Sequence, residues 1–132
     1  MRISVDTNLL VRAAVEDEPA QTRLAIESMQ KAMLVAVSVE ALCEFVWVLR
    51  RSYKRPSAGV ALSIRRLVDS PNVVTDRPAV DAGLAVLDAG GDFADGVIAY
   101  QGQMLGGETF LSFDRNAVQL IAAQGGRAEL LG

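Results

Sequence analysis

Short runs of apolar residues alternate with longer amphipathic stretches along the whole chain. We expect strands at Arg2–Val5, Met33–Val37, Asn72–Thr75, Thr109–Phe113 and Ala128–Leu131. We expect helical stretches after Pro19, from an N-cap at Ser57, and from near Pro78 and Asn116. Strands separated by helices are typical of parallel α/β domains, because a parallel pair needs a long crossover connection. The pattern therefore predicts an α/β fold with a mainly parallel sheet.

The length of the chain bounds its organisation. Its 132 residues are enough for one domain with a buried core, and no repeat, linker or low-complexity stretch is visible. We therefore expect residues 1–132 to form a single domain. The longest apolar run, Ala32–Val37, is far shorter than the roughly 18 residues of a membrane span, and no secretory signal is visible. These features predict a soluble cytoplasmic protein without a membrane partner.

The absence of histidine restricts the chemistry. The chain has no His and a single Cys, Cys43, so Ser-His-Asp catalysis, Cys-His catalysis and zinc sites built on His or Cys are excluded. If the protein is an enzyme, carboxylates must carry the reaction. The net charge of −3 argues weakly against a general nucleic-acid coat protein.

Two carboxylates follow predicted strands directly. Asp6 comes after the first strand, in "SVDTNL", and Asp114 closes "TFLSFD" near the end of the chain. Ligands of open parallel sheets bind beyond the carboxyl ends of the strands, so these two acids can meet at one edge. Each acid alone is equally well explained as the N-cap of a following helix.

Glu44 is the only charged residue in the apolar segment "ALCEFVWVL". This composition predicts a helix that is apolar on nearly every face, and hence a buried carboxylate. Burial costs several kcal/mol unless the carboxylate is paired with a charge or a metal. The alternative is a structural ion pair with Arg50 or Arg51, or a position at an exposed edge.

Asp92 and Asp95 are three residues apart in "GGDFADGVIAY", at the predicted start of a helix. Asp92 has the N-cap position and Asp95 the third helical position, on one face. The helix dipole stabilises acids at both positions without any catalytic duty. Taken alone, this segment is best explained by helix capping.

The acids together point to a metal site. Oxygen ligands without His or Cys select Mg²⁺, with Mn²⁺ as a second choice. Three or four carboxylates around one cleft are the arrangement that two-metal cleavage of phosphodiesters uses.

Four blocks of the sequence resemble one protein family in order and spacing. They are "DTNLLVR", "VSVEALCEFVWVLRRSY", "GGDFADGVIAYQGQMLGG" and "TFLSFDR". The chain resembles PIN-domain ribonucleases, and among them the VapC-type toxins of toxin–antitoxin modules. The resemblance runs from about Ile3 to Ile121 and implies a three-layer α/β/α sandwich around a mainly parallel sheet.

The resemblance also implies roles for individual residues. The catalytic, metal-binding acids would be Asp6, Glu44, Asp95 and Asp114. Thr7 and Asn8 would orient Asp6 and metal-bound water, Asp92 would support the site, and Ser112 stands where threonine is frequent. Gly96 stands where alanine usually follows the third acid, and would weaken its helix by about 1 kcal/mol.

Basic residues offer RNA contacts. Without the four site acids, 12 acidic residues face 13 basic ones, so the rest of the molecule is close to +1. The densest basic stretch is "RRSYKR", with Arg50, Arg51 and a Tyr53 that can stack on a base. Arg115, next to Asp114, can hold a phosphate. A solvated helix end explains the basic stretch equally well.

The resemblance implies partners as well: an RNA substrate, a small cognate antitoxin, and a second copy of the chain in a homodimer. An arginine from the antitoxin would suit an acidic cleft, since it can pair with two carboxylates. The helix that contains Trp47 is a candidate contact surface, although its composition favours a core position for Trp47.

Other α/β families fit less well. A receiver domain needs a lysine at a later strand end, and Lys31 and Lys54 are the only lysines. A haloacid-dehalogenase-type phosphatase needs a second Asp where Asn8 stands. A dinucleotide-binding domain needs a Gly-x-Gly-x-x-Gly turn, which is absent. The remaining alternative is a PIN-fold module that binds RNA or a protein partner without cutting.

Overall fold

The computed structural model describes all of residues 1–132, with five strands and seven helices, and one or two helices separate each strand from the next. The strands are β1 (Arg2–Ser4), β2 (Leu34–Ala36), β3 (Val73–Val74), β4 (Phe110–Ser112) and β5 (Ala128–Leu130). The helices are α1 (Thr7–Ala14), α2 (Pro19–Lys31), α3 (Val39–Arg51), α4 (Ser57–Val68), α5 (Arg77–Asp88), α6 (Phe93–Met104) and α7 (Arg115–Ala123).

The predicted α/β class is confirmed. Every expected strand is present, shortened by one or two residues, and every strand pair is parallel. This helix-rich architecture is consistent with the three-layer α/β/α fold that the resemblance implies. The predicted N-cap at Ser57 is wrong: Pro56 has the cap position without a side-chain hydrogen bond, and Ser57 is the first helical residue.

The chain divides into two compact units, residues 1–76 and residues 77–132. They are described separately below, as the N-terminal unit and the C-terminal unit. The expectation of a single domain stays a prediction.

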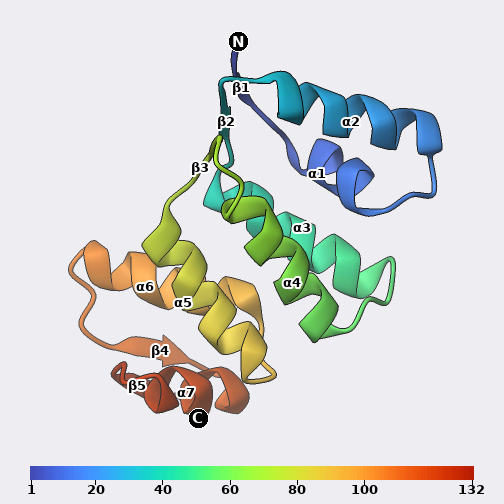
Figure 1. The fold of residues 1–132 in the computed structure, drawn as a ribbon. Coiled ribbons are helices and arrows are strands. Elements are labelled where there is room, and N and C mark those ends of the chain that lie inside the picture. The colour runs from blue at the N-terminus through green and yellow to red at the C-terminus, as the bar shows by residue number, and fades with distance from the viewer. The chain divides into compact units, whose positions relative to one another are not determined.

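The N-terminal unit contains a three-stranded parallel sheet in the order β1-β2-β3 (Figure 1). Ile3 is aligned with Val35, and Val35 with Val73. Helix α1 packs on α2 and α3, and α3 packs on α4. The most buried side chains of this unit lie on β2, α3 and α4, and they are Val35, Leu42, Leu49, Val60 and Ile64. Helix α1 also has two buried residues, Leu10 and Val11, and it packs against α3.

The C-terminal unit contains the parallel pair β4-β5, with α7 packed on both strands. Helices α5 and α6 cross very closely, because glycines stand at the contact. A Cβ on Gly83 would lie 2.7 Å from the ring of Phe93, and one on Gly96 would overlap the carbonyl oxygen of Ala82. The close crossing lets α5 bury the first turn of α6, where Phe93 is fully enclosed.

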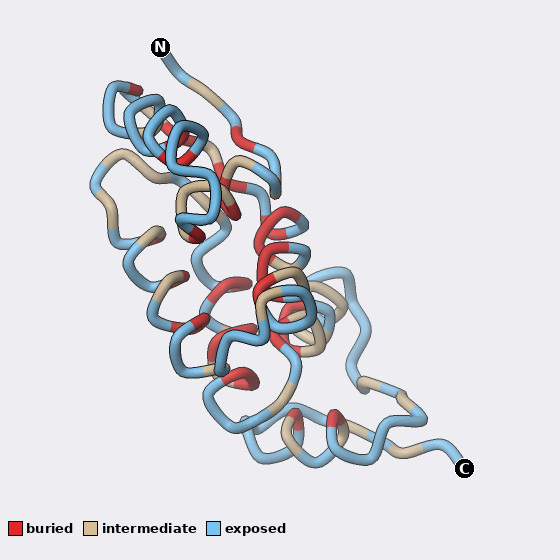
Figure 2. Tube along the Cα trace, turned by 90° about the vertical axis from the view of Figure 1, so that its right-hand side faces the viewer, coloured by how far each residue is buried: buried red, intermediate tan, exposed pale blue.

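Burial follows the helical period in both units. Figure 2 shows buried segments that recur along the helices between exposed ones. None of the helices combines the length and the apolar character that crossing a bilayer requires.

Candidate functional site

Asp6 lies just beyond the carboxyl end of β1 and is the N-cap of α1. Its Oδ1 accepts a hydrogen bond from the backbone N–H of Leu9 at 2.9 Å. Its other oxygen accepts no hydrogen bond, and the residue is exposed. Capping therefore uses only half of the carboxylate, and Asp6 can cap its helix and bind a ligand at the same time.

Glu44 is joined to α1 by Thr7. The Thr7 hydroxyl donates a hydrogen bond to Glu44 Oε2 at 3.2 Å. Helix α3 begins after Ser38, whose hydroxyl accepts from the N–H of Ala41 at 3.1 Å. The N-terminal unit thus brings Thr7 and Glu44 together, next to Asp6 in sequence. Asn8 is exposed and makes no side-chain hydrogen bond.

The prediction that Glu44 is buried is wrong, because α3 is amphipathic and Glu44 lies on its exposed side. The alternative of an ion pair with Arg50 or Arg51 is also wrong. Arg50 donates instead to the carbonyl oxygen of Arg55 at 3.0 Å, and the Arg51 guanidinium lies 5.6 Å from the centre of the Trp47 ring. Glu44 is therefore an exposed carboxylate whose side-chain partner is the Thr7 hydroxyl.

Asp114 has the same arrangement in the C-terminal unit. It follows β4 and caps α7, where its Oδ1 accepts from the N–H groups of Asn116 and Ala117 at 3.0 and 3.2 Å. Its second oxygen accepts no hydrogen bond. The Ser112 hydroxyl accepts from the N–H of Asp114 at 2.9 Å and so stabilises the turn that carries the acid.

Asp92 and Asp95 lie at the start of α6. Asp92 is the N-cap, as the sequence predicts, and its Oδ1 accepts from the N–H of Ala94 at 3.1 Å. Asp95 is half-buried and its carboxylate accepts no hydrogen bond. Burial raises the pKa of Asp95, and the negative charges of Asp92 and then Asp114 raise it further. The C-terminal unit therefore brings three acids into electrostatic contact.

The basic residues have different surroundings. Arg115 is the exposed first residue of α7, directly after Asp114. The Tyr53 hydroxyl accepts from Arg12 at 2.7 Å and donates to Asp17 at 3.0 Å, and Arg12 also pairs with Asp17 at 3.1 Å. Sequence reasoning missed this network. It had no local signal, because Arg12 and Tyr53 are 41 positions apart.

Neither unit by itself brings three or more carboxylates close enough to hold a metal ion. The chemistry of the donors nevertheless fits a hard divalent cation. All four proposed ligands are carboxylates, each keeps at least one oxygen without a hydrogen bond, and a cation would offset the mutual repulsion of the acids around Asp95.

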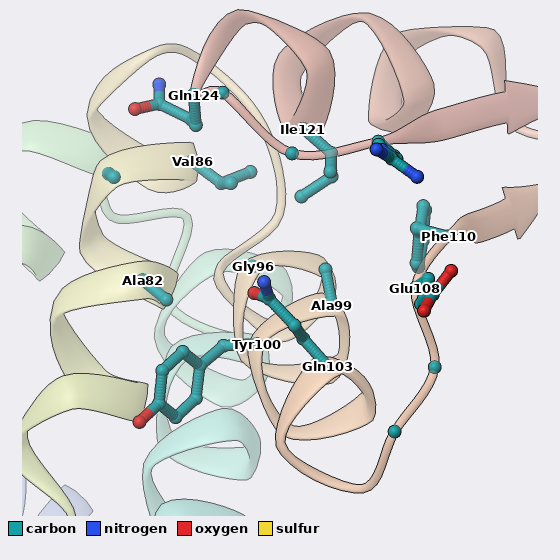
Figure 3. Close-up of a pocket in the computed structure, with 16 residues that line it drawn as sticks. Ala82, Val86, Gly96, Ala99, Tyr100, Gln103, Glu108, Phe110, Ile121 and Gln124 are labelled. Carbon is teal, nitrogen blue, oxygen red and sulfur yellow. The ribbon is translucent and has the colours of Figure 1, made fainter.

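A cavity of about 840 Å³ lies in the C-terminal unit and contains none of the proposed acids. Figure 3 shows small and apolar side chains such as Ala82, Ala99 and Val86 along it, with Tyr100 and Gln103 among the polar ones. Gly96 is its one lining residue next to a proposed site acid. None of the proposed site acids therefore lines the cavity, whose acidic residue is Glu108.

Comparison with known families gives one result. The PIN domain model matches residues 3–122, which include most of each unit and all of the acids described above. No curated protein sequence matches the chain significantly. The match supports a nuclease-type fold, in agreement with the parallel strands and with the acids that follow β1 and β4. The chain belongs to the PIN domain family.

Proposed function

We propose that the protein is a divalent-metal-dependent endoribonuclease that acts as the toxin of a type II toxin–antitoxin system. One observation carries the proposal. Asp6 and Asp114 follow different parallel strands, each caps a helix with one oxygen, and each keeps the other oxygen free of hydrogen bonds. Helix capping alone does not require acids, because Ser, Thr and Asn cap as well.

The proposed metal ligands are Asp6, Glu44, Asp95 and Asp114. Their donor set suits Mg²⁺ and also accepts Mn²⁺. When bound, such an ion supplies a more acidic water and stabilises negative charge on the phosphate and the leaving oxygen. One ion or two would be compatible with four carboxylates.

The other residues of the set hold these acids in place. Thr7 fixes the direction of the Glu44 carboxylate through its hydroxyl. Ser112 and the N-terminal turn of α7 hold Asp114, and Asp92 holds the first turn of α6, on which Asp95 is placed. Asn8 remains a proposed ligand of water. Fixed acids of this kind align an attacking water with a phosphodiester at little cost in entropy.

RNA is the proposed substrate. Arg115 would contact a phosphate next to Asp114, and Arg50 and Arg51 would extend the basic surface at the end of α3. Tyr53 is a weaker candidate for stacking, since its hydroxyl is engaged by Arg12 and Asp17. The surplus of basic over acidic residues outside the four acids supports an attraction to RNA.

The proposed partners are a small antitoxin that blocks the acids and a second copy of the chain. An antitoxin arginine would pair with two carboxylates at once. The resemblance to VapC-type toxins supports both partners, and it supports a cytoplasmic site of action, where RNA is available.

Cleavage of RNA by the purified protein tests the proposal. We expect cleavage with Mg²⁺ or Mn²⁺ and none in excess EDTA, and we expect growth inhibition on expression in cells. Asp6→Asn and Asp114→Asn should both be inactive. An RNA-binding protein that cuts under none of these conditions would instead be the non-cutting PIN-fold module. Undiminished cleavage in EDTA would contradict metal dependence.

A further inference from the structure

Helix α3 presents one narrow exposed stripe, made of Glu40, Glu44, Trp47 and Arg51. At 3.6 residues per turn these four positions fall within about 60° of each other around the helix. All four are exposed, while Leu42, Phe45, Val46 and Leu49 are buried on the other side. The stripe therefore runs from acids at one end, through an aromatic ring, to a cation at the other.

Trp47 is the unusual member of this stripe. The sequence favoured a core position, but the residue is 59% exposed. Burial of a tryptophan side chain contributes strongly to folding stability, and an exposed tryptophan does not make this contribution in full. The Arg51 guanidinium lies 5.6 Å from the ring centre, which restrains the orientation of both side chains. An ordered aromatic ring beside a cation is the arrangement that single-stranded nucleic acids use for stacking.

The charges near Trp47 indicate what it contacts. Arg50, Arg51, Lys54 and Arg55 are four cations within six residues, without an acid among them. Arg51 forms no ion pair with a carboxylate, so its charge is available to a ligand. The stripe is acidic on the Glu44 side of Trp47 and basic on the Arg51 side. The exposed ring beside these cations is complementary to a base and its phosphate, whereas an apolar protein partner would leave the charges without compensation.

We propose that Trp47 and Arg51 form a subsite for single-stranded RNA, in which Trp47 stacks on a base and Arg51 contacts a phosphate. This inference rests on the proposed ribonuclease function and adds the subsite next to Glu44. At a rise of 1.5 Å per residue, Trp47 lies about 4.5 Å and Arg51 about 10 Å from Glu44 along the helix. The stacked base would therefore be a close neighbour of the phosphodiester at the carboxylate.

The intrinsic fluorescence of the protein reports directly on this contact, because Trp47 is its only tryptophan. We would titrate the wild type with a short single-stranded RNA of mixed sequence in EDTA, so that the RNA stays intact. Stacking should quench the emission of Trp47. An RNA that binds without quenching, or does not bind at all, would overturn the inference.

Binding of the same fluorescein-labelled RNA, measured by anisotropy, tests the individual side chains. We expect Trp47→Ala to weaken binding roughly tenfold and Trp47→Phe to restore most of it. Arg51→Gln should lower the slope of log affinity against log salt by about 0.7. Leu24→Ala and Arg23→Gln remove an exposed leucine and an exposed arginine on α2 of the same unit, and both should bind as the wild type does.

Two further measurements are needed. One asks whether Trp47 is an RNA subsite or a dimer contact, and the other tests the cleavage reaction independently of the subsite. Sedimentation of Trp47→Ala shows whether the residue lies between two copies of the chain: a lost dimer with unchanged RNA binding would overturn the subsite. Cleavage with Mg²⁺ is assayed separately. Wild-type cleavage without quenching would refute the subsite alone, and quenching without any cleavage would refute the proposed function alone.

Discussion

The hydroxyl of Thr7 donates a hydrogen bond to Oε2 of Glu44 at 3.2 Å, between residues that are 37 positions apart. The bond joins the first residue of α1, next to the Asp6 cap, to the middle of α3. A threonine side chain is short and stiff about χ1, so the bond restricts the direction of the carboxylate. The N-terminal unit thus fixes the position of Glu44 relative to Asp6, although the two acids are remote in sequence.

Thr7→Val should reduce RNA cleavage roughly tenfold, because Glu44 loses the bond that orients it. The free energy of unfolding should fall by less than about 1.5 kcal/mol, since one partly exposed hydrogen bond is lost. Cleavage rates and denaturant titrations of the variant measure both effects. Thr7→Ser keeps the hydroxyl and serves as the control, and it should retain most of the activity. Equal cleavage by Thr7→Val and the wild type would show that the hydroxyl does not position Glu44.

Asp6→Asn should abolish cleavage and growth inhibition while the fold stays intact. Asparagine caps a helix about as well as aspartate, so the bond to the Leu9 N–H has a replacement. Removal of one negative charge should also leave the metal-free protein as stable as the wild type or more stable. Melting temperatures in EDTA measure this, and a large decrease would mean that Asp6 has a structural role instead.

Glu44→Leu should be inactive but lose no more than about 1 kcal/mol of stability. The carboxylate is exposed and has no ion-pair partner, so its removal leaves no stranded charge. Denaturant titration without divalent ions measures the difference from the wild type. Glu44→Gln keeps an acceptor for the Thr7 hydroxyl and removes only the charge. If both variants lost several kcal/mol, Glu44 would be part of a structural interaction.

Asp95 should make the stability of the metal-free protein depend on pH. Its pKa is raised, so the folded protein holds this proton more tightly than the unfolded chain. Its favourable contribution is therefore complete below the ordinary pKa of 3.8 and is lost as the pH rises through the higher folded value. Asp95→Asn stays neutral, so in EDTA it should exceed the wild type in stability at neutral pH and approach it in acid. A variant that is less stable at neutral pH would contradict this.

Cleavage should separate Asp92 from Asp95. Asp92→Asn preserves the cap on the Ala94 N–H and should keep much of the activity. Asp95→Asn removes a proposed ligand and should lower the rate on the order of 100-fold or more, with weaker metal binding. Rates for both variants at several Mg²⁺ concentrations decide between them. Equal losses would make the two acids joint ligands, and a greater loss for Asp92→Asn would reverse the assignment.

Gly96→Ala should destabilise the protein by about 1–3 kcal/mol, because the new methyl group would overlap the carbonyl oxygen of Ala82 in α5. Gly102→Ala, in the same helix, is the matched control. A Cβ there meets nothing within 4 Å, so the change should stabilise α6 by roughly 0.5–1 kcal/mol. Thermal melts of both variants measure the two effects. The glycine that follows Asp95 is therefore a packing requirement, and not only a weak point in the helix.

The sequence by itself determined the local structure and the places of the acids. Strand and helix periods predicted the order of the elements. The cap at Asp92 was predictable because capping is a local interaction: the carboxylate accepts from the N–H of Ala94, two residues along the chain. The helix after Asp6 was expected only as the alternative in which Asp6 is an N-cap, and the structure shows that helix as α1. Its eight residues, Thr7–Ala14, are amphipathic but make only about two turns, which is too short for a stable helix alone, and its packing on α2 and α3 supports it.

Tertiary structure decided which side each residue of α3 faces and which distant residues meet. The apolar run around Glu44 does not reveal that Glu44 and Trp47 share the exposed side, because the buried side is chosen by packing against α1 and α4. The contacts of Thr7 with Glu44 and of Arg12 with Tyr53 join positions about 40 residues apart. The requirement for glycine at position 96 likewise arises from the close approach of α5. Such contacts have no local signature, since they depend on the path of the whole chain between the two residues.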